Sequence, residues 1–377
     1  MRRWKKIMIS CFVIGIVWSL GTTCLAREKQ SEDRIDQIEY LEDRIEEELA
    51  KGSSSFTIYV NKEIEEEELQ EVNQNLDGFY GYVDRYSQWS FPFITYYKTV
   101  FYLNNSDNYY VLAALTGDYS FTEDQRKAKQ LAAQVEEIQN AIMEEGMTED
   151  KKVKAVHDYL IDHTSYMEQE EESGEGSDEY TAYGVLMNHE GVCSGYTQAF
   201  QLFMKLNGIE SKIVLGEADG VSHSWNLIFL DGDWYHVDTT WDDPVPDEEN
   251  RHVYAYYNVT DEDMEASHSW KKEDYPKAEG TKYNYYVQNG YVIENQEEFI
   301  KFAREKIEKE EPVIHCLIEN YKEEDYNREL FQQIMNGTKA RSLNFQAYGE
   351  GSKKAFRLVP EYERRSNEYR CIYQTAG

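Results

Sequence analysis

The stretch EGVCSGYTQAF, Glu190 to Phe200, places one cysteine between two glycines where a loop leads into an apolar-faced helix. Aromatic and apolar residues recur after Cys193 at helical spacing, and Gly208 supplies a helix-terminating signal. Cys193 is therefore expected near the N-terminus of a helix, where unpaired N–H groups and the helix dipole favour a thiolate. Gly191 and Gly195 favour close approach of a substrate backbone. The alternative for Cys193 is a buried small residue.

A predicted β-hairpin downstream brings a histidine and an aspartate together. VSHSWNLIFL and DWYHVDTTW are β-like runs joined by Asp231 and Gly232, a favoured two-residue turn. In the register that this turn sets, His223 is the diagonal neighbour of Asp238 on one sheet face. The same count puts His236 on that face, opposite the strand carrying His223. Spacing alone does not choose between the two histidines.

Three motifs in this region resemble the bacterial branch of the transglutaminase-like superfamily. They are GVCSGYTQAF, SHSWNLIFLDGDWYHVDTTWDDP and YYNVTDEDMEASHSW, and the resemblance covers about residues 125–270. It implies an α+β fold with a papain-like core, in which a cysteine helix packs on an antiparallel sheet. Carried over residue by residue, it implies Cys193 as nucleophile, His223 as base and Asp238 as the group that orients the base. It leaves His236 as a non-catalytic strand residue.

The resemblance also implies a reaction. A thiolate–imidazolium pair would attack a protein or peptide carboxamide to give a thioester, which water or an amine resolves without a cofactor. The backbone N–H of Cys193 would meet the oxyanion with one further donor, for which Tyr183 and Asn188 are candidates; a structural role is the alternative for each. Trp225 and Trp241 are candidate cleft-wall or core aromatics. The sequence does not separate peptide cleavage, deamidation and cross-linking.

The other histidines and cysteines are expected to be structural. His157 and His163 lie in or just after a predicted helix without a partner set for metal or catalysis, and His268 in the third motif is assigned a packing role. No Cys/His cluster has zinc spacing and no acidic run has a calcium-loop pattern, so no metal is predicted. Cys316 and Cys371 lie in β-like runs, where burial or mutual pairing is expected.

Composition indicates a folded, very acidic protein. Of 377 residues, 72 are acidic and 39 basic, for a formal net charge of −33, while 31 Tyr and 15 Phe supply aromatic material for packing. A chain with this charge repels polyanions at long range. Nucleic acid is therefore excluded as an expected partner, and the expected partner is a protein or peptide substrate.

The first 26 residues have the pattern of a secretory signal peptide. A basic start precedes an apolar stretch from Ile7 to Leu20, and Ala26 offers a cleavage point. The apolar stretch is shorter than the roughly 20 residues that a spanning helix needs, although an uncleaved membrane anchor is the rival interpretation. The predicted location is extracytoplasmic, either secreted or anchored at the cell surface.

The rest of the chain divides into four predicted parts. Residues 27–52 read as a charged, solvated linker or helix, 123–275 as the transglutaminase-like domain, and 53–122 and 276–377 as small α+β accessory segments. In the first accessory segment we expect a strand, an acidic helix over 64–76, and two aromatic strands, TYYKTVFYL and NYYVLAALTGDY, joined by a turn at NNSDN. The last segment repeats this order, which suggests related folds.

Between the predicted helices and the cysteine lies an acidic run. Glu168 to Glu179 holds seven acids in twelve residues and no apolar side chain. We expect it to border the cleft and favour neutral or cationic substrates. A solvated insertion without substrate contact is the alternative.

Two functions from different classes fit these observations. The first is an exported cysteine acyltransferase or hydrolase, and the intact set of Cys193, His223 and Asp238 favours it. The alternative is a non-catalytic binding or scaffolding protein of the cell envelope that uses the same fold.

Overall fold

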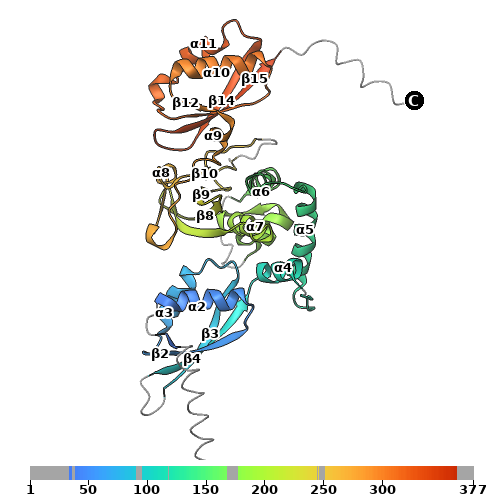
Figure 1. The fold of residues 1–377 in the computed structure, drawn as a ribbon, viewed down its shortest axis with the longest axis vertical. Helices are drawn as coiled ribbons and strands as arrows, with labels where there is room; N and C mark the ends of the chain where they lie inside the picture. The colour runs from blue at the N-terminus through green and yellow to red at the C-terminus, as the bar shows by residue number, and fades with distance from the viewer. Residues whose placement is uncertain are drawn as a thin grey trace, which may run out of the picture. The chain divides into compact units, whose positions relative to one another are not determined.

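The computed structural model describes residues 34–35, 39–90, 96–117, 119–167, 177–243, 245 and 251–362. They form two compact units, whose boundary along the chain falls near residues 115–129 (Figure 1). The expected α+β class is confirmed, because helices accompany sheets whose longer strand pairs are all antiparallel. Three features expected from the sequence lie outside the described residues. They are the signal peptide or anchor at 1–26, residues 168–176 of the acidic run, and Cys371.

The first unit is built on a four-stranded sheet with the order β1-β2-β4-β3. Its elements are β1 (Arg34–Ile35), α2 (Glu39–Ala50), β2 (Ser55–Val60), α3 (Glu66–Asn75), β3 (Gly81–Ser90) and β4 (Tyr97–Asn105). Helix α2 buries Leu41, Ile45 and Leu49 in the core of this sheet. The expectation of a solvated helix or linker over 27–52 is therefore wrong for α2, whose apolar residues at helical spacing form a packing face.

The stretch NYYVLAALTGDY is a helix and not the expected strand. Helix α4 spans Asp107–Thr116. Ser106 caps it, since its Oγ accepts a hydrogen bond from the Tyr109 N–H at 3.3 Å. The residues interpreted as a hairpin turn are therefore a helix start. Strand β4 instead lies between β2 and β3, and in β3 a register shift between Val83 and Arg85 interrupts the alternation that marks a strand in sequence.

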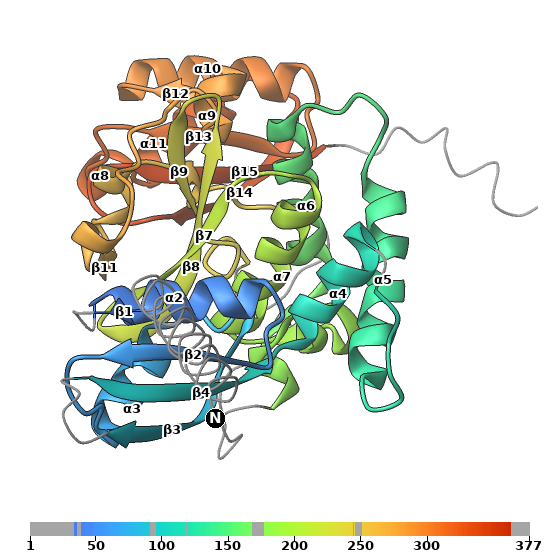
Figure 2. The same cartoon turned by 60° about the horizontal axis from the view of Figure 1, so that its bottom comes forward.

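The C-terminal sheet has the same topology as the first one. Its elements are β12 (Val292–Ile293), α10 (Gln296–Glu308), β13 (Ile314–Ile318), α11 (Arg328–Met335), β14 (Ala340–Tyr348) and β15 (Lys354–Tyr362). The strand order is β12-β13-β15-β14, again with one parallel pair followed by two antiparallel pairs. Helices α10 and α11 lie side by side on this sheet (Figure 2). The flanking segments thus share a βαβαββ arrangement.

The central region combines helices with a five-stranded antiparallel sheet of order β10-β9-β8-β7-β11. Its helices are α5 (Arg126–Ile142), α6 (Glu149–His163), α7 (Cys193–Leu206), α8 (Asp261–Met264) and α9 (Tyr285–Asn289), with short turns η1 (Asp178–Tyr180), η2 (Gly184–Asn188) and η3 (Lys272–Asp274). Its strands are β5 (Ser165–Tyr166), β6 (Glu190–Gly191), β7 (Ser211–Ala218), β8 (Val221–Leu230), β9 (Asp233–Val237), β10 (Tyr257–Val259) and β11 (His268–Trp270). Helix α7 packs on β7 and β8, which is the expected cysteine helix on an antiparallel sheet (Figure 2).

None of the helices in the described ranges has the length and apolar character needed to cross a membrane.

Candidate active site

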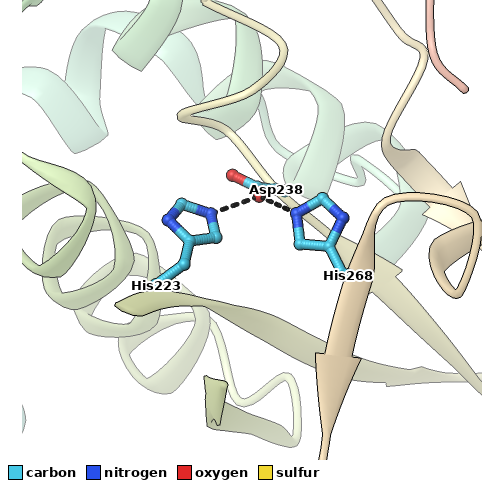
Figure 3. Close-up of side chains that lie close together, drawn as sticks. All are labelled: His223, Asp238 and His268. Atoms are coloured by element: carbon cyan, nitrogen blue, oxygen red, sulfur yellow. Dashed lines mark hydrogen bonds and ion pairs between the residues drawn. The ribbon is translucent and has the colours of Figure 1, made fainter. Parts of the chain in front are cut away.

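The β8–β9 hairpin has the register expected from its turn. Asp231 and Gly232 both have positive φ, 56° and 102°, and Leu230 pairs with Asp233. This register carries His223 on β8 to the carboxylate of Asp238, the residue after β9. The His223 Nε2 and the Asp238 Oδ2 are 2.7 Å apart (Figure 3).

Cys193 begins α7, as expected, and its thiol interacts with the imidazole of His223. Because Nε2 of the imidazole is engaged by Asp238, Nδ1 is the nitrogen left for the thiol. Burial raises the pKa of the Cys193 thiol, but the hydrogen bond and charge of His223 and the hydrogen bonds of Ser224 outweigh burial, so that the pKa is lowered. His223 thus bonds to the Asp238 carboxylate and interacts with the Cys193 thiol, which ionises more easily than usual.

The Asp238 carboxylate is buried and accepts four hydrogen bonds. Oδ2 accepts from His223 and from His268 Nε2 at 3.1 Å, and Oδ1 accepts from the backbone N–H groups of Thr240 and Trp241 at 3.0 and 3.1 Å. Burial raises its pKa, but these partners hold the pKa well below the usual range. Burial lowers the pKa of His223, but Asp238 and, to a smaller extent, Cys193 raise it to about 10. The site therefore favours a carboxylate next to an imidazolium.

A transglutaminase-like family model matches residues 136–239, a range that contains all three of these side chains. This region belongs to the transglutaminase-like superfamily. The human Kyphoscoliosis peptidase is 23% identical over 124 residues, which cover 28% of this chain and 18% of that protein. The mouse protein is 22% identical over 134 residues, 32% of this chain and 20% of its own. The match spans about a fifth of the length of these curated relatives.

A crystal structure of a TGase is similar at 15% identity with a TM-score of 0.27, covering 53% of this chain and 54% of that one. The superfamily's members are in general cysteine-based enzymes, and the transglutaminase-like region here carries the cysteine at the start of its helix.

His236 is the second histidine that strand spacing allowed as the base. Its ring nitrogens bond away from the Cys193 thiol. Its Nδ1 accepts from Trp225 Nε1 at 2.8 Å, and its Nε2 is 2.9 Å from Asp261 Oδ1. Burial lowers its pKa despite Asp261. Both ring nitrogens are therefore committed to a structural network, which leaves His223 as the imidazole next to Cys193.

His268 hydrogen-bonds to Asp238 and so belongs to the site, although the sequence analysis assigned it a packing role. It comes from β11, at the edge of the sheet farthest from Asp238 in strand order. With His223 and Asp238 it places three ligand atoms within 4.8 Å of one another, a spacing that a metal ion can use. Hydrogen bonds within the group engage each of these atoms, so we assign none of them as a metal ligand.

The two tryptophans differ in position. Trp225 is 1% exposed and its ring stacks on His223 at 5.9 Å, which makes it a core aromatic behind the imidazole. Trp241 is partly exposed, and its ring lies 4.6 Å from His268 and 6.2 Å from His223. Trp241 is therefore the more exposed of the two aromatic side chains beside the site.

The two candidates for a second oxyanion donor gain no support. The Tyr183 hydroxyl is 3.4 Å from Gln130 Oε1 on α5, and Asn188 is exposed at the end of η2. Their side chains belong to the segment that wraps the start of α7, and neither is part of the set formed by Cys193, His223 and Asp238.

The glycines flanking Cys193 serve the chain's own packing. A Cβ on Gly195 would lie 2.6 Å from the Glu179 carbonyl oxygen, and one on Gly191 would lie 2.5 Å from Val185 Cγ2. The expectation that they open space for a substrate backbone is wrong. They allow residues 179–185 to close over the N-terminus of the cysteine helix.

His157 has partners that the sequence did not reveal. It is buried on α6, with Nε2 3.1 Å from Asp242 Oδ2 and Nδ1 3.2 Å from Asp158 Oδ1. Asp242 Oδ1 also accepts from the Tyr256 N–H at 2.9 Å. This second histidine–carboxylate group holds the loop after Asp238 against α6. His163, by contrast, is exposed as the last residue of α6, and its Nδ1 bonds to the Tyr159 carbonyl.

Proposed function

We propose that this chain is an exported cysteine acyltransferase or hydrolase acting on carboxamides of proteins or peptides. The observation that carries the proposal is the position of His223, between the thiol of Cys193 and the carboxylate of Asp238. The membership of this region in a superfamily of cysteine-based enzymes supports it.

In this proposal Cys193 attacks the substrate and His223 transfers the protons. The Cys193 thiolate adds to the amide carbonyl carbon, and the negative charge on the carbonyl oxygen is met by the Cys193 N–H at the start of α7, where N–H groups lack helical partners. When the C–N bond breaks, His223 Nδ1 gives its proton to the leaving amine and a thioester remains. His223 then takes a proton from water or from an amine, whose attack on the thioester restores the thiol.

Asp238 keeps this cycle in one tautomer. Its carboxylate accepts the Nε2–H of His223, so the exchangeable proton stays on the nitrogen that faces the sulfur. The carboxylate stays ionised throughout, because four donors and the imidazolium stabilise its charge.

Export rests on the sequence of the first 26 residues, and location at the cell surface or in the medium is part of the proposal. The N-terminus of the protein purified from its native host tests it. A mature chain beginning at Arg27 supports cleavage, and one beginning at Met1 in the cytosolic fraction contradicts export.

Incubation with glutamine-containing peptides, with and without a primary amine, tests the activity by mass spectrometry. Deamidation adds about 1 Da, amine incorporation adds the amine less ammonia, and cleavage gives two fragments. Cys193→Ser should abolish every product, and Cys316→Ser, which removes a buried thiol on β13, is the matched control that should keep them. Ligand capture without any product from the wild-type chain would favour the scaffolding alternative.

A further inference from the structure

His268 is a second imidazole on the carboxylate that orients the base. Its side chain is fully buried, and Nε2 lies 3.1 Å from the same Asp238 oxygen that receives His223. Figure 3 shows the carboxylate between the two rings, with one ring on β8 and the other on β11. A packing role does not require a ring nitrogen to face this oxygen.

The hydrogen bonds around His268 have a single consistent direction. An ionised carboxylate only accepts, so His268 Nε2 must donate to Asp238. In the neutral ring Nδ1 then accepts, and the partner at 2.8 Å is the Ser267 hydroxyl. Since that hydroxyl has one proton, it must accept in turn from the Tyr256 hydroxyl at 3.2 Å. Asp238 therefore fixes the tautomer of His268, as it fixes that of His223, and Ser267 donates to the ring nitrogen that carries no proton.

We propose that His268 is a positioning residue of the reaction, which holds Asp238 Oδ2 in line with His223 so that His223 keeps its proton on the side of Cys193. This inference rests on the proposed function, since it concerns the same site. The backbone donors at Thr240 and Trp241 anchor only Oδ1. Without His268 the carboxylate can turn about that anchored oxygen, and the hydrogen bond to His223 weakens.

Other titratable groups also face these rings. Cys193 approaches from α7, and Asp238 follows β9. His236 on β9 interacts with His268, while Tyr256 and Asp242 lie near Asp238. Because the thiol depends on this set through His223, the pH dependence of thiol reactivity reports the placement of Asp238.

The test is the rate of Cys193 alkylation by iodoacetamide from pH 5 to 10, followed by peptide mass spectrometry in the full chain without any peptide substrate. His268→Phe keeps a ring and removes the donor, whereas His268→Gln keeps an N–H donor and loses the ring. We expect the pH of half-maximal alkylation to rise in His268→Phe, with a loss of about 10-fold or more at pH 6, and to return toward wild type in His268→Gln. Ser267→Ala, which keeps the ring and removes the hydroxyl that donates to its Nδ1, should shift in the same direction by less.

The opposite ranking, with His268→Phe like wild type and His268→Gln impaired, overturns the proposal in favour of packing. A profile that is unchanged, or shifted to lower pH, in a folded His268→Phe and in Ser267→Ala also overturns it. His163→Phe, an exposed histidine replaced in the same way, is the matched control and should leave the profile unchanged. Slow alkylation of the wild-type thiol would instead contradict the proposed function.

Discussion

Replacing Asp238 by Asn is expected to remove almost all activity while keeping the shape of the site. The Asn carbonyl oxygen can still accept from the two backbone N–H groups that now bond to Oδ1. Its NH2 group would then face the Nε2–H donors of His223 and His268, so that donor meets donor. His223 must move its proton to Nδ1, and it loses the lone pair that serves the Cys193 thiol.

The magnitude follows from the charge that is removed. Burial lowers the pKa of His223, but Asp238 first, and Cys193 with it, raise this pKa from 6.5 to about 10. A difference of about 3.5 pH units corresponds to roughly 5 kcal/mol in favour of the imidazolium. The wrong tautomer in a triad of this kind costs about 10⁴-fold in kcat. We expect kcat of Asp238→Asn to fall by about 10³- to 10⁴-fold, and Cys193 to need a higher pH to ionise.

The assay is ammonia release from a glutamine peptide, with Cys193 alkylation against pH as a second measurement. Asp261→Asn is the matched control, because Asp261 accepts from His236 in the same sheet without contact with the thiol. It should lower stability and leave kcat within a few-fold of wild type. A folded Asp238→Asn enzyme within 10-fold of wild type would refute the assignment of Asp238.

Three further predictions concern the surroundings of the site. His223→Ala should lower kcat by at least about 10²-fold, whereas His236→Ala should lower the melting temperature with little effect on kcat; the reverse result would mean that the histidines were misassigned. His157→Ala removes the partner of the buried Asp242 carboxylate and one partner of the half-buried Asp158, and should cost about 3–5 kcal/mol in urea unfolding. Burial lowers the pKa of His157, but Asp158 and Asp242 raise it above its unfolded value, so this contribution should be fully present below pH about 6.5 and lost as the pH rises through the folded pKa; a cost independent of pH would contradict that. Deleting residues 168–176 should reduce the preference for basic over acidic peptides at low salt and not at high salt. An unchanged preference would mean that the acidic run is a solvated insertion without substrate contact.

Local signals in the sequence predicted the hairpin register, whereas the choice of His223 over His236 came from the resemblance to the transglutaminase-like superfamily. Asp231 and Gly232 fix a two-residue turn because both adopt positive φ, and the count from that turn leads to His223 and Asp238. The helical spacing after Cys193 placed the thiol at a helix start. These features depend on neighbours within about 15 residues, which a sequence pattern can report.

Features that depend on the order of strands and on single caps were beyond the sequence. His268 reaches Asp238 only because β11 joins the sheet beside β7, and no local pattern encodes that order. His157 was missed because its partner Asp242 is 85 residues away. The strand expected after NNSDN was wrong because one hydroxyl, that of Ser106, makes the turn a helix cap.

The central claim is that Cys193 is an activated nucleophile, and the most direct measurement is competitive alkylation of the folded protein at pH 6. Cys316 provides the internal comparison, since it is a buried thiol whose pKa burial raises far above the usual range. Peptide mapping after a short exposure to iodoacetamide should find Cys193 modified at least about 10-fold faster than Cys316, and His223→Ala should slow the modification of Cys193. Equal modification of the two thiols in the folded wild-type chain, or a Cys193 rate unchanged by His223→Ala, would contradict the account.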